Sequence, residues 1–97
     1  MLRYFFLGFV RIHILHHADR EPVFGAGIRE ELARHGYHLS FGTLYPILHG
    51  LEKQGYLTSY HEVVNGKVRK YYRTTQAGTA ALREAKEKIA ELVEEVL

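Results

Sequence analysis

The side chains best suited to bind another molecule are concentrated between residues 40 and 54. They carry hydroxyl, phenol, imidazole and ammonium groups, which hydrogen-bond, stack or pair with an anion: Ser40, Thr43, Tyr45, His49 and Lys53. Apolar residues fall between them at helical spacing and form one stripe: Leu44, Ile47, Leu48 and Leu51. The solvent-facing side of a helix normally carries mainly Lys and Glu. Here the side opposite the apolar stripe carries the hydrogen-bonding residues named above and also Phe41. It therefore indicates a surface that contacts something.

Cations form a second group of candidate binding residues, directly after Asn65-Gly66: Lys67, Arg69 and Lys70. Asn-Gly between two runs of β-branched and aromatic residues, 56–64 and 67–74, is a strong signal for a β-hairpin. Cations gathered at a hairpin tip predict attraction to phosphate or another anion. Solubility is the alternative role for them.

Histidine is frequent, with seven in the chain. His13 and His17 stand four residues apart in a predicted helix, with His16 between them, so two imidazoles can share a metal ion. No carboxylate stands at helical spacing to complete the site from the same helix, although Asp19 is near. We therefore favour a solvated helix end over a metal sensor, and assign neither a metal nor a cofactor.

Catalytic chemistry has little support in this sequence. The residue pattern suggests no arrangement of a nucleophile, a base and a group that orients the base. We therefore assign no catalytic residue and expect no enzyme. The absence of cysteine removes disulfides, thiolate zinc sites and thiol catalysis together. It also fits a cytosolic protein.

The elements that position these groups can be predicted in turn, beginning with a helix of about four turns over residues 40–54. Ser40 is a good N-cap, because its hydroxyl accepts from backbone N–H groups of the first turn. Gly55 suits a left-handed C-terminal cap. Pro46 lies beyond the first turn, where proline removes a hydrogen bond. The helix is therefore expected either to start nearer Thr43 or to bend at Pro46.

A second helix is predicted to precede it, from Val23 to Arg34, with Ile28 and Leu32 facing inward and a glycine cap at Gly36. Two helices joined by a short turn form a helix-turn-helix pattern, and the basic hairpin makes it the winged form. The predicted fold is mainly α with a small β-hairpin. It comprises a winged helix-turn-helix DNA-binding domain over residues 1–75 and a C-terminal dimerisation helix over residues 76–97.

The first helix, residues 2–15, is apolar nearly all round, so more than one of its sides must be covered. Its apolar run is shorter than the roughly 20 residues that a membrane span needs, and Arg11 interrupts it. No membrane partner is therefore expected. We place Phe5, Phe6 and Phe9 against a partner chain; filling the domain's own core is an equally good alternative.

The C-terminal helix carries apolar residues at spacings of three and four, the seam of a coiled coil: Leu82, Ala85, Ile89, Leu92 and Val96. This seam predicts a homodimer, most simply through the same helix of a second copy. The alternative is that the helix folds back on the first helix of its own chain.

Composition fits one small domain, with 97 residues of which 46% are apolar. Charge is uneven along it: residues 1–75 carry a formal charge of +4 and residues 76–97 a charge of −2. A positive body and a negative tail suit a body that meets an anion such as nucleic acid.

Two motifs resemble those of the PadR-type transcriptional regulators. One is Leu-Ser-x-Gly-Thr-Leu-Tyr-Pro-x-Leu-x-x-Leu-Glu-x-x-Gly at residues 39–55, and the other is Arg-Lys-Tyr-Tyr-Arg-x-Thr-x-x-Gly at residues 69–78. The resemblance implies a winged helix-turn-helix DNA-binding protein, usually a dimeric repressor of a partly palindromic operator in the cytoplasm. This chain is similar to the short members, with a single C-terminal helix.

On this interpretation the helix 40–54 enters the major groove of double-stranded DNA while the wing, residues 65–70, reaches the neighbouring backbone or minor groove. Two alternatives remain open. The dimer centre could hold an apolar small-molecule effector between the three phenylalanines and the C-terminal helices, which would make the protein a ligand-gated regulator. Alternatively, the winged helix could bind protein, although a basic wing favours DNA.

Overall fold

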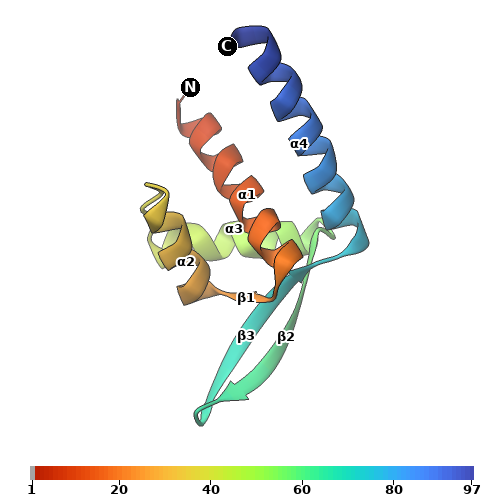
Figure 1. Ribbon diagram of the computed structural model, residues 1–97. Coiled ribbons are helices and arrows are strands. Elements are labelled where there is room, and N and C mark those ends of the chain that lie inside the picture. The colour runs from red at the N-terminus through yellow and green to blue at the C-terminus, as the bar shows by residue number, and fades with distance from the viewer. Residues whose placement is uncertain (1) are drawn as a thin grey trace.

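The computed structural model describes residues 2–97 as a mainly helical fold with one small sheet (Figure 1). Its elements in chain order are α1 (Leu2–Arg20), β1 (Val23–Phe24), α2 (Gly25–Arg34), α3 (Phe41–Lys53), β2 (Leu57–Val64), β3 (Lys67–Thr74) and α4 (Gln76–Val96). Helices α2 and α3 with the β2–β3 hairpin make a winged helix-turn-helix, so the predicted fold class is confirmed.

The hairpin turns at Asn65-Gly66 as predicted. Both residues have positive φ, 52° and 77°, which is the backbone of a type I′ turn and explains the Asn-Gly pair. The sheet has a third strand that the sequence analysis missed, because β1 pairs antiparallel with β3 through Val23 opposite Tyr72 and Phe24 opposite Tyr71. The helix predicted from Val23 therefore starts at Gly25, because the two preceding residues are held extended by the sheet.

Helix α3 begins at Phe41, and the prediction of Ser40 as its N-cap is confirmed. The Ser40 hydroxyl accepts from the backbone N–H of Thr43 at 3.2 Å. Pro46 lies inside the helix, so the alternative that the helix starts nearer Thr43 is wrong. Gly55 follows the last turn with a φ of 86°, the left-handed conformation that ends the helix.

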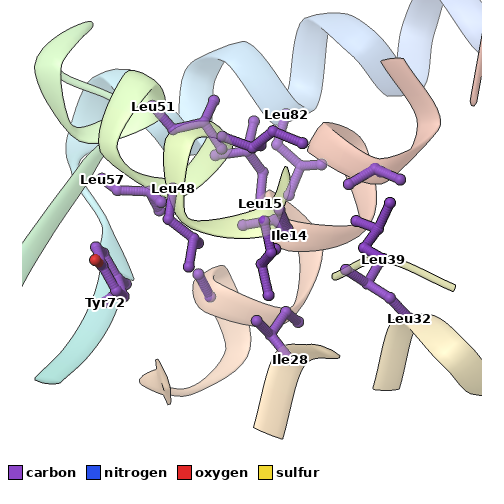
Figure 2. Packing of buried hydrophobic residues seen from close by; sticks show 14 residues of the cluster. Ile14, Leu15, Ile28, Leu32, Leu39, Leu48, Leu51, Leu57, Tyr72 and Leu82 are labelled. Carbon is purple, nitrogen blue, oxygen red and sulfur yellow. The ribbon is translucent and has the colours of Figure 1, made fainter. Parts of the chain in front are cut away.

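The core draws on every helix and on the two long strands (Figure 2). Its centre is the buried face of α3, namely Leu44, Ile47, Leu48 and Leu51. Helix α1 contributes Val10, Ile14, Leu15 and Ala18, and α2 contributes Ile28 and Leu32. Leu57, Tyr72 and Leu82 close the cluster from β2, β3 and α4. This core holds α3 with its opposite face at the surface.

The beginning of α1 and the end of α4 both lie on the side of the molecule opposite the hairpin tip (Figure 1). Helices α1 and α4 pack against each other, and α4 continues past the core. The second half of α4, from Lys86 onward, is exposed throughout. In the region covered by the structure, no helix has the length and apolar character needed to cross a membrane.

Candidate nucleic-acid interface

Three rings form a row along the exposed face of α3. Phe41 and Tyr45 stack with centroids 5.5 Å apart, and Tyr45 and His49 stack with centroids 6.2 Å apart. Because each ring stands four residues after the previous one, the row follows the helix axis. Tyr45 is 40% exposed, so it lies at the surface and is not a core aromatic. The row presents an aromatic surface with a phenol and an imidazole to whatever approaches α3.

Tyr45 also joins α3 to the beginning of α2. A Cβ placed on Gly25 would lie 2.6 Å from the Tyr45 hydroxyl oxygen, far inside van der Waals contact. Glycine at this position therefore lets the tyrosine lie across the first residue of α2.

A groove of about 480 Å³ separates this edge of α2 and α3 from the wing, residues 65–70, and the last residue of β2. Its walls are formed by Phe24, Gly25, Ala26, Tyr45, Val64, Asn65, Lys67, Val68, Arg69, Lys70 and Tyr72. One wall therefore carries the wing cations and the other carries the start of α2.

The N-terminus of α2 is an additional binding candidate that the sequence analysis missed. Its N-cap, Phe24, provides no side-chain hydrogen bond, so the first N–H groups of the helix lack a side-chain partner there. Gly25 and Ala26 line the groove, and the positive end of the helix dipole favours an anion. The sequence carried a signal for it, because Phe24-Gly25-Ala26-Gly27 contains no Ser, Thr, Asp or Asn whose side chain could cap the helix.

The three predicted wing cations differ in how they are held. Lys67 is exposed. The Arg69 guanidinium lies 4.0 Å from the centroid of the Phe24 ring and donates to the Tyr71 hydroxyl at 3.4 Å. The Lys70 ammonium lies 3.6 Å from a carboxylate oxygen of Glu52. Two of the three cations are therefore fixed by neighbouring side chains.

Glu52 connects α3 to both long strands. Its carboxylate accepts from the Ser59 hydroxyl on β2 and pairs with Lys70 on β3. The side chains of Glu52 and Lys70 are each about one-third exposed. This carboxylate therefore helps fix the wing relative to α3, a role that the sequence pattern did not reveal.

The remaining predicted residues lie at the two ends of α3. Ser40 and Thr43 stand at its N-terminus, and their hydroxyls are 3.3 Å apart. Lys53 is exposed at its C-terminus. Beside Ser40 lies a cation that was not predicted: Arg29 donates to the Leu39 carbonyl at 2.7 Å and stacks over the Phe41 ring at 4.5 Å.

The predicted dimer residues divide into exposed and buried ones. On α1, Phe5 and Phe9 are 50% and 48% exposed, whereas Phe6 is half-buried with its ring 4.9 Å from that of Tyr37. Leu82 is buried in the chain's own core, so its placement in an interface was wrong. Leu82 faces inward because the first turns of α4 pack on α1.

The other seam residues follow the length of α4. Ala85 is half-buried, while Ile89, Leu92 and Val96 are exposed. Val93, which the sequence analysis did not select, is also an exposed apolar residue of this helix. The alternative that α4 folds back on α1 therefore holds for its first turns only.

A helix-turn-helix whose second helix exposes a row of aromatic and hydrogen-bonding side chains beside a cationic hairpin defines a DNA-binding protein of the winged-helix class.

The comparisons with known proteins give the family. The model of the family described as "Transcriptional regulator PadR-like family" matches residues 14–84, and the chain belongs to this PadR-like family. The transcriptional regulator Rv3488 of Mycobacterium tuberculosis (strain ATCC 25618 / H37Rv) is 54% identical over 88 residues, which are 91% of this chain and 82% of the relative. The protein is accordingly a DNA-binding transcriptional regulator and not an enzyme.

Solved structures agree with this assignment. A PadR family transcriptional regulator from Eggerthella lenta DSM 2243 is 36% identical, with a TM-score of 0.85 over 99% of this chain and 85% of that one. A PadR-like transcription factor from Bacteroides fragilis is 31% identical, with a TM-score of 0.82 over 93% of this chain and 88% of that one. The resemblance found in the two sequence motifs is thereby confirmed.

Proposed function

We propose that this protein is a dimeric repressor that binds a palindromic operator in the cytoplasm, with α3 in the major groove and the β2–β3 hairpin on the adjacent backbone or minor groove. The observation that carries the proposal is the exposed row of Phe41, Tyr45 and His49, whose middle residue, Tyr45, lines the groove leading to the wing. An α-helix fits the width of the major groove, and a hairpin beside it reaches the flanking phosphates.

Within α3, His49 and Tyr45 are the residues proposed to reach base edges. Both can hydrogen-bond and both are exposed near the middle of the helix. Ser40 and Thr43 at one end and Lys53 at the other contact phosphates, which sets the register of the helix on the duplex. The free N–H groups at the start of α2 bind a phosphate of the same strand.

The wing supplies sequence-independent attraction. Lys67 is exposed at the hairpin tip and contacts phosphate directly. Arg69 and Lys70 also contribute positive charge, but the contacts with Phe24 and Glu52 give them a second role in holding the wing in position.

A second copy of the chain is proposed to cover the apolar ends of α1 and α4. Phe5 and Phe9 on α1 and Leu92 and Val96 on α4 are about half exposed or more, and the outer ends of these two helices lie away from the wing (Figure 1). Exposed large apolar side chains of this kind support an association site. The division into a DNA-binding unit, residues 1–75, and a dimerisation helix, residues 76–97, remains a prediction, although Leu82 belongs to the common core.

Footprinting on the DNA upstream of the protein's own gene tests this proposal. A dimer with one α3 in each half-site should protect two symmetric half-sites whose centres lie about 34–36 Å apart, or a multiple of that distance. Size-exclusion chromatography with light scattering gives the mass of the free protein, which should be that of two chains. In an in vitro transcription assay, the protein should lower transcript yield from the protected promoter. A single unsymmetric footprint with a monomeric mass would contradict the proposal.

A further inference from the structure

Helix packing brings three histidines into one cluster between α1 and α2. His13 and His17 come from α1, and His35 follows the last residue of α2. One ring nitrogen from each of the three lies within 4.8 Å of the other two. The sequence showed only His13, His16 and His17. The structure adds His35 to the group, whereas the His16 ring lies edge-on to that of His17 with centroids 5.0 Å apart.

A carboxylate joins the same cluster from α2. One oxygen of Glu31 lies 3.7 Å from Nε2 of His17 and 3.5 Å from Nε2 of His35. The other oxygen accepts from Arg34 at 2.8 Å, which orients the carboxylate. On the histidines' own helix the nearest carboxylate, that of Asp19, accepts hydrogen bonds from Thr74 and Thr79 instead. The missing oxygen donor is on the neighbouring helix.

The surroundings suit an ion that enters from solvent. The His17 and Glu31 side chains are about one-quarter exposed, and that of His35 about one-half. The His13 ring is half-buried and stacks on His35 with centroids 4.8 Å apart, with Tyr37 on another side.

We propose that His13, His17 and His35, with Glu31 as the fourth ligand, bind one divalent transition-metal ion of the zinc class. Zinc is bound tetrahedrally by nitrogen and oxygen ligands at about 2.0–2.2 Å, which places neighbouring ligand atoms about 3.4 Å apart. The three histidine nitrogens lie within 4.8 Å of one another, so binding would draw them closer by up to about 1.4 Å.

The chemistry of the ligands also predicts which ions are excluded. Imidazole suits zinc, copper, nickel and cobalt, whereas magnesium and calcium prefer all-oxygen sites. The ion would link the C-terminal half of α1 to the end of α2, which leads into α3. Through its side-chain ligands the ion would therefore connect α1, the helix that carries the exposed phenylalanines, with the helix-turn-helix.

Isothermal titration of the untagged full chain with zinc sulfate after chelator treatment tests the site. We expect one zinc ion per chain, an increase in the melting temperature, and no response to magnesium. Cobalt bound in place of zinc should show the strong visible absorption of a tetrahedral complex. His35→Ala should weaken zinc binding more than tenfold, because one of the four ligands is removed, and Glu31→Gln should weaken it less.

The control is His38→Ala, which removes an exposed histidine of the turn between α2 and α3 that lies outside the cluster. This variant should bind zinc like the unaltered protein. Circular dichroism checks that the His35→Ala variant is folded. We expect it to fold, because His35 is exposed. Equal zinc affinity for the unaltered protein and His35→Ala would overturn the site, as would the absence of zinc binding to the unaltered chain.

Discussion

Lys70 on β3 and Glu52 near the end of α3 form an ion pair, with 3.6 Å between the ammonium nitrogen and the carboxylate oxygen. The pair joins the wing to the helix proposed to read DNA. Ser59 on β2 donates to the same carboxylate, so one acidic side chain contacts both strands of the hairpin. An acidic residue beside a DNA-binding surface repels phosphate, and its position here is explained by the contacts that orient the wing.

Glu52→Gln is expected to weaken DNA binding severalfold, although it removes a negative charge. Glutamine keeps an acceptor for Ser59 but lacks the charge that holds Lys70, so the wing is less well positioned. Fluorescence anisotropy with a labelled operator measures the change. Glu62→Gln, on the exposed part of β2, is the matched control and should bind slightly more tightly. Tighter binding by both variants would show that Glu52 acts only through its charge.

Gly25→Ala is expected to lower operator affinity with little loss of stability. The new methyl group would lie 2.6 Å from the Tyr45 hydroxyl oxygen, and the tyrosine would rotate away from the start of α2. Since the end of a side chain moves more easily than backbone, the melting temperature should change by only a few degrees. Anisotropy and thermal melts on the same samples separate the two effects. A normal affinity would argue against Tyr45 as a contact residue.

Gly78→Ala is expected to destabilise the fold by about 1–3 kcal/mol or more. A Cβ at this position would lie 2.0 Å from the backbone carbonyl oxygen of Tyr56, so α4 would have to shift away from the core. Gly50→Ala on α3 is the contrasting variant, because apart from the adjacent backbone of its own helix nothing lies within 4 Å of its Cβ position. It should stabilise the helix by about 0.5–1 kcal/mol. Urea unfolding measures both, and equal midpoints for the two variants would contradict this packing.

Asp19 gives a pH dependence with a defined sign. Its carboxylate accepts from Thr79 at 2.6 Å and from Thr74 at 2.9 Å, and these bonds lower its pKa below the ordinary value of 3.8. A carboxyl whose pKa is lower in the folded state stabilises the fold above pH 3.8, and loses that contribution as the pH falls through the lowered value. Asp19→Asn should therefore show a smaller decrease in melting temperature between about pH 6 and pH 3 than the unaltered chain. Parallel curves for the two proteins would count against this role.

Local sequence signals predicted the elements that depend on neighbouring residues. Ser40 and Gly55 fixed α3, and Asn65-Gly66 fixed the hairpin, because capping and turn formation need only a few consecutive residues. Strand β1 was missed because two residues have no strand pattern of their own and become a strand only by pairing with β3. The seam of α4 gave the right periodicity, but spacing alone does not tell which partner Leu82 meets.

The same limit applies to the candidate site: the part that depends on local spacing was predicted, and the part that depends on tertiary packing was not. The exposed face of α3 follows from helical spacing, so Tyr45 and His49 were found. The ion pair between Glu52 and Lys70 needs β3 to pass the C-terminal end of α3, and the approach of His35 to His13 needs α1 and α2 to pack. These pairs join residues 18 and 22 positions apart, and no local pattern encodes them.

The most direct test of DNA recognition by α3 is a titration of the protein against its upstream DNA at two salt concentrations, with a scrambled duplex as competitor. We expect binding that survives the competitor, and loss of that preference when Tyr45→Ala and His49→Ala are combined. Lys67→Ala should instead weaken binding to both duplexes. It should also reduce the slope of log affinity against log salt by about 0.9 for each phosphate that the protein no longer neutralises. Equal affinity of the unaltered protein for both duplexes would contradict sequence-specific recognition.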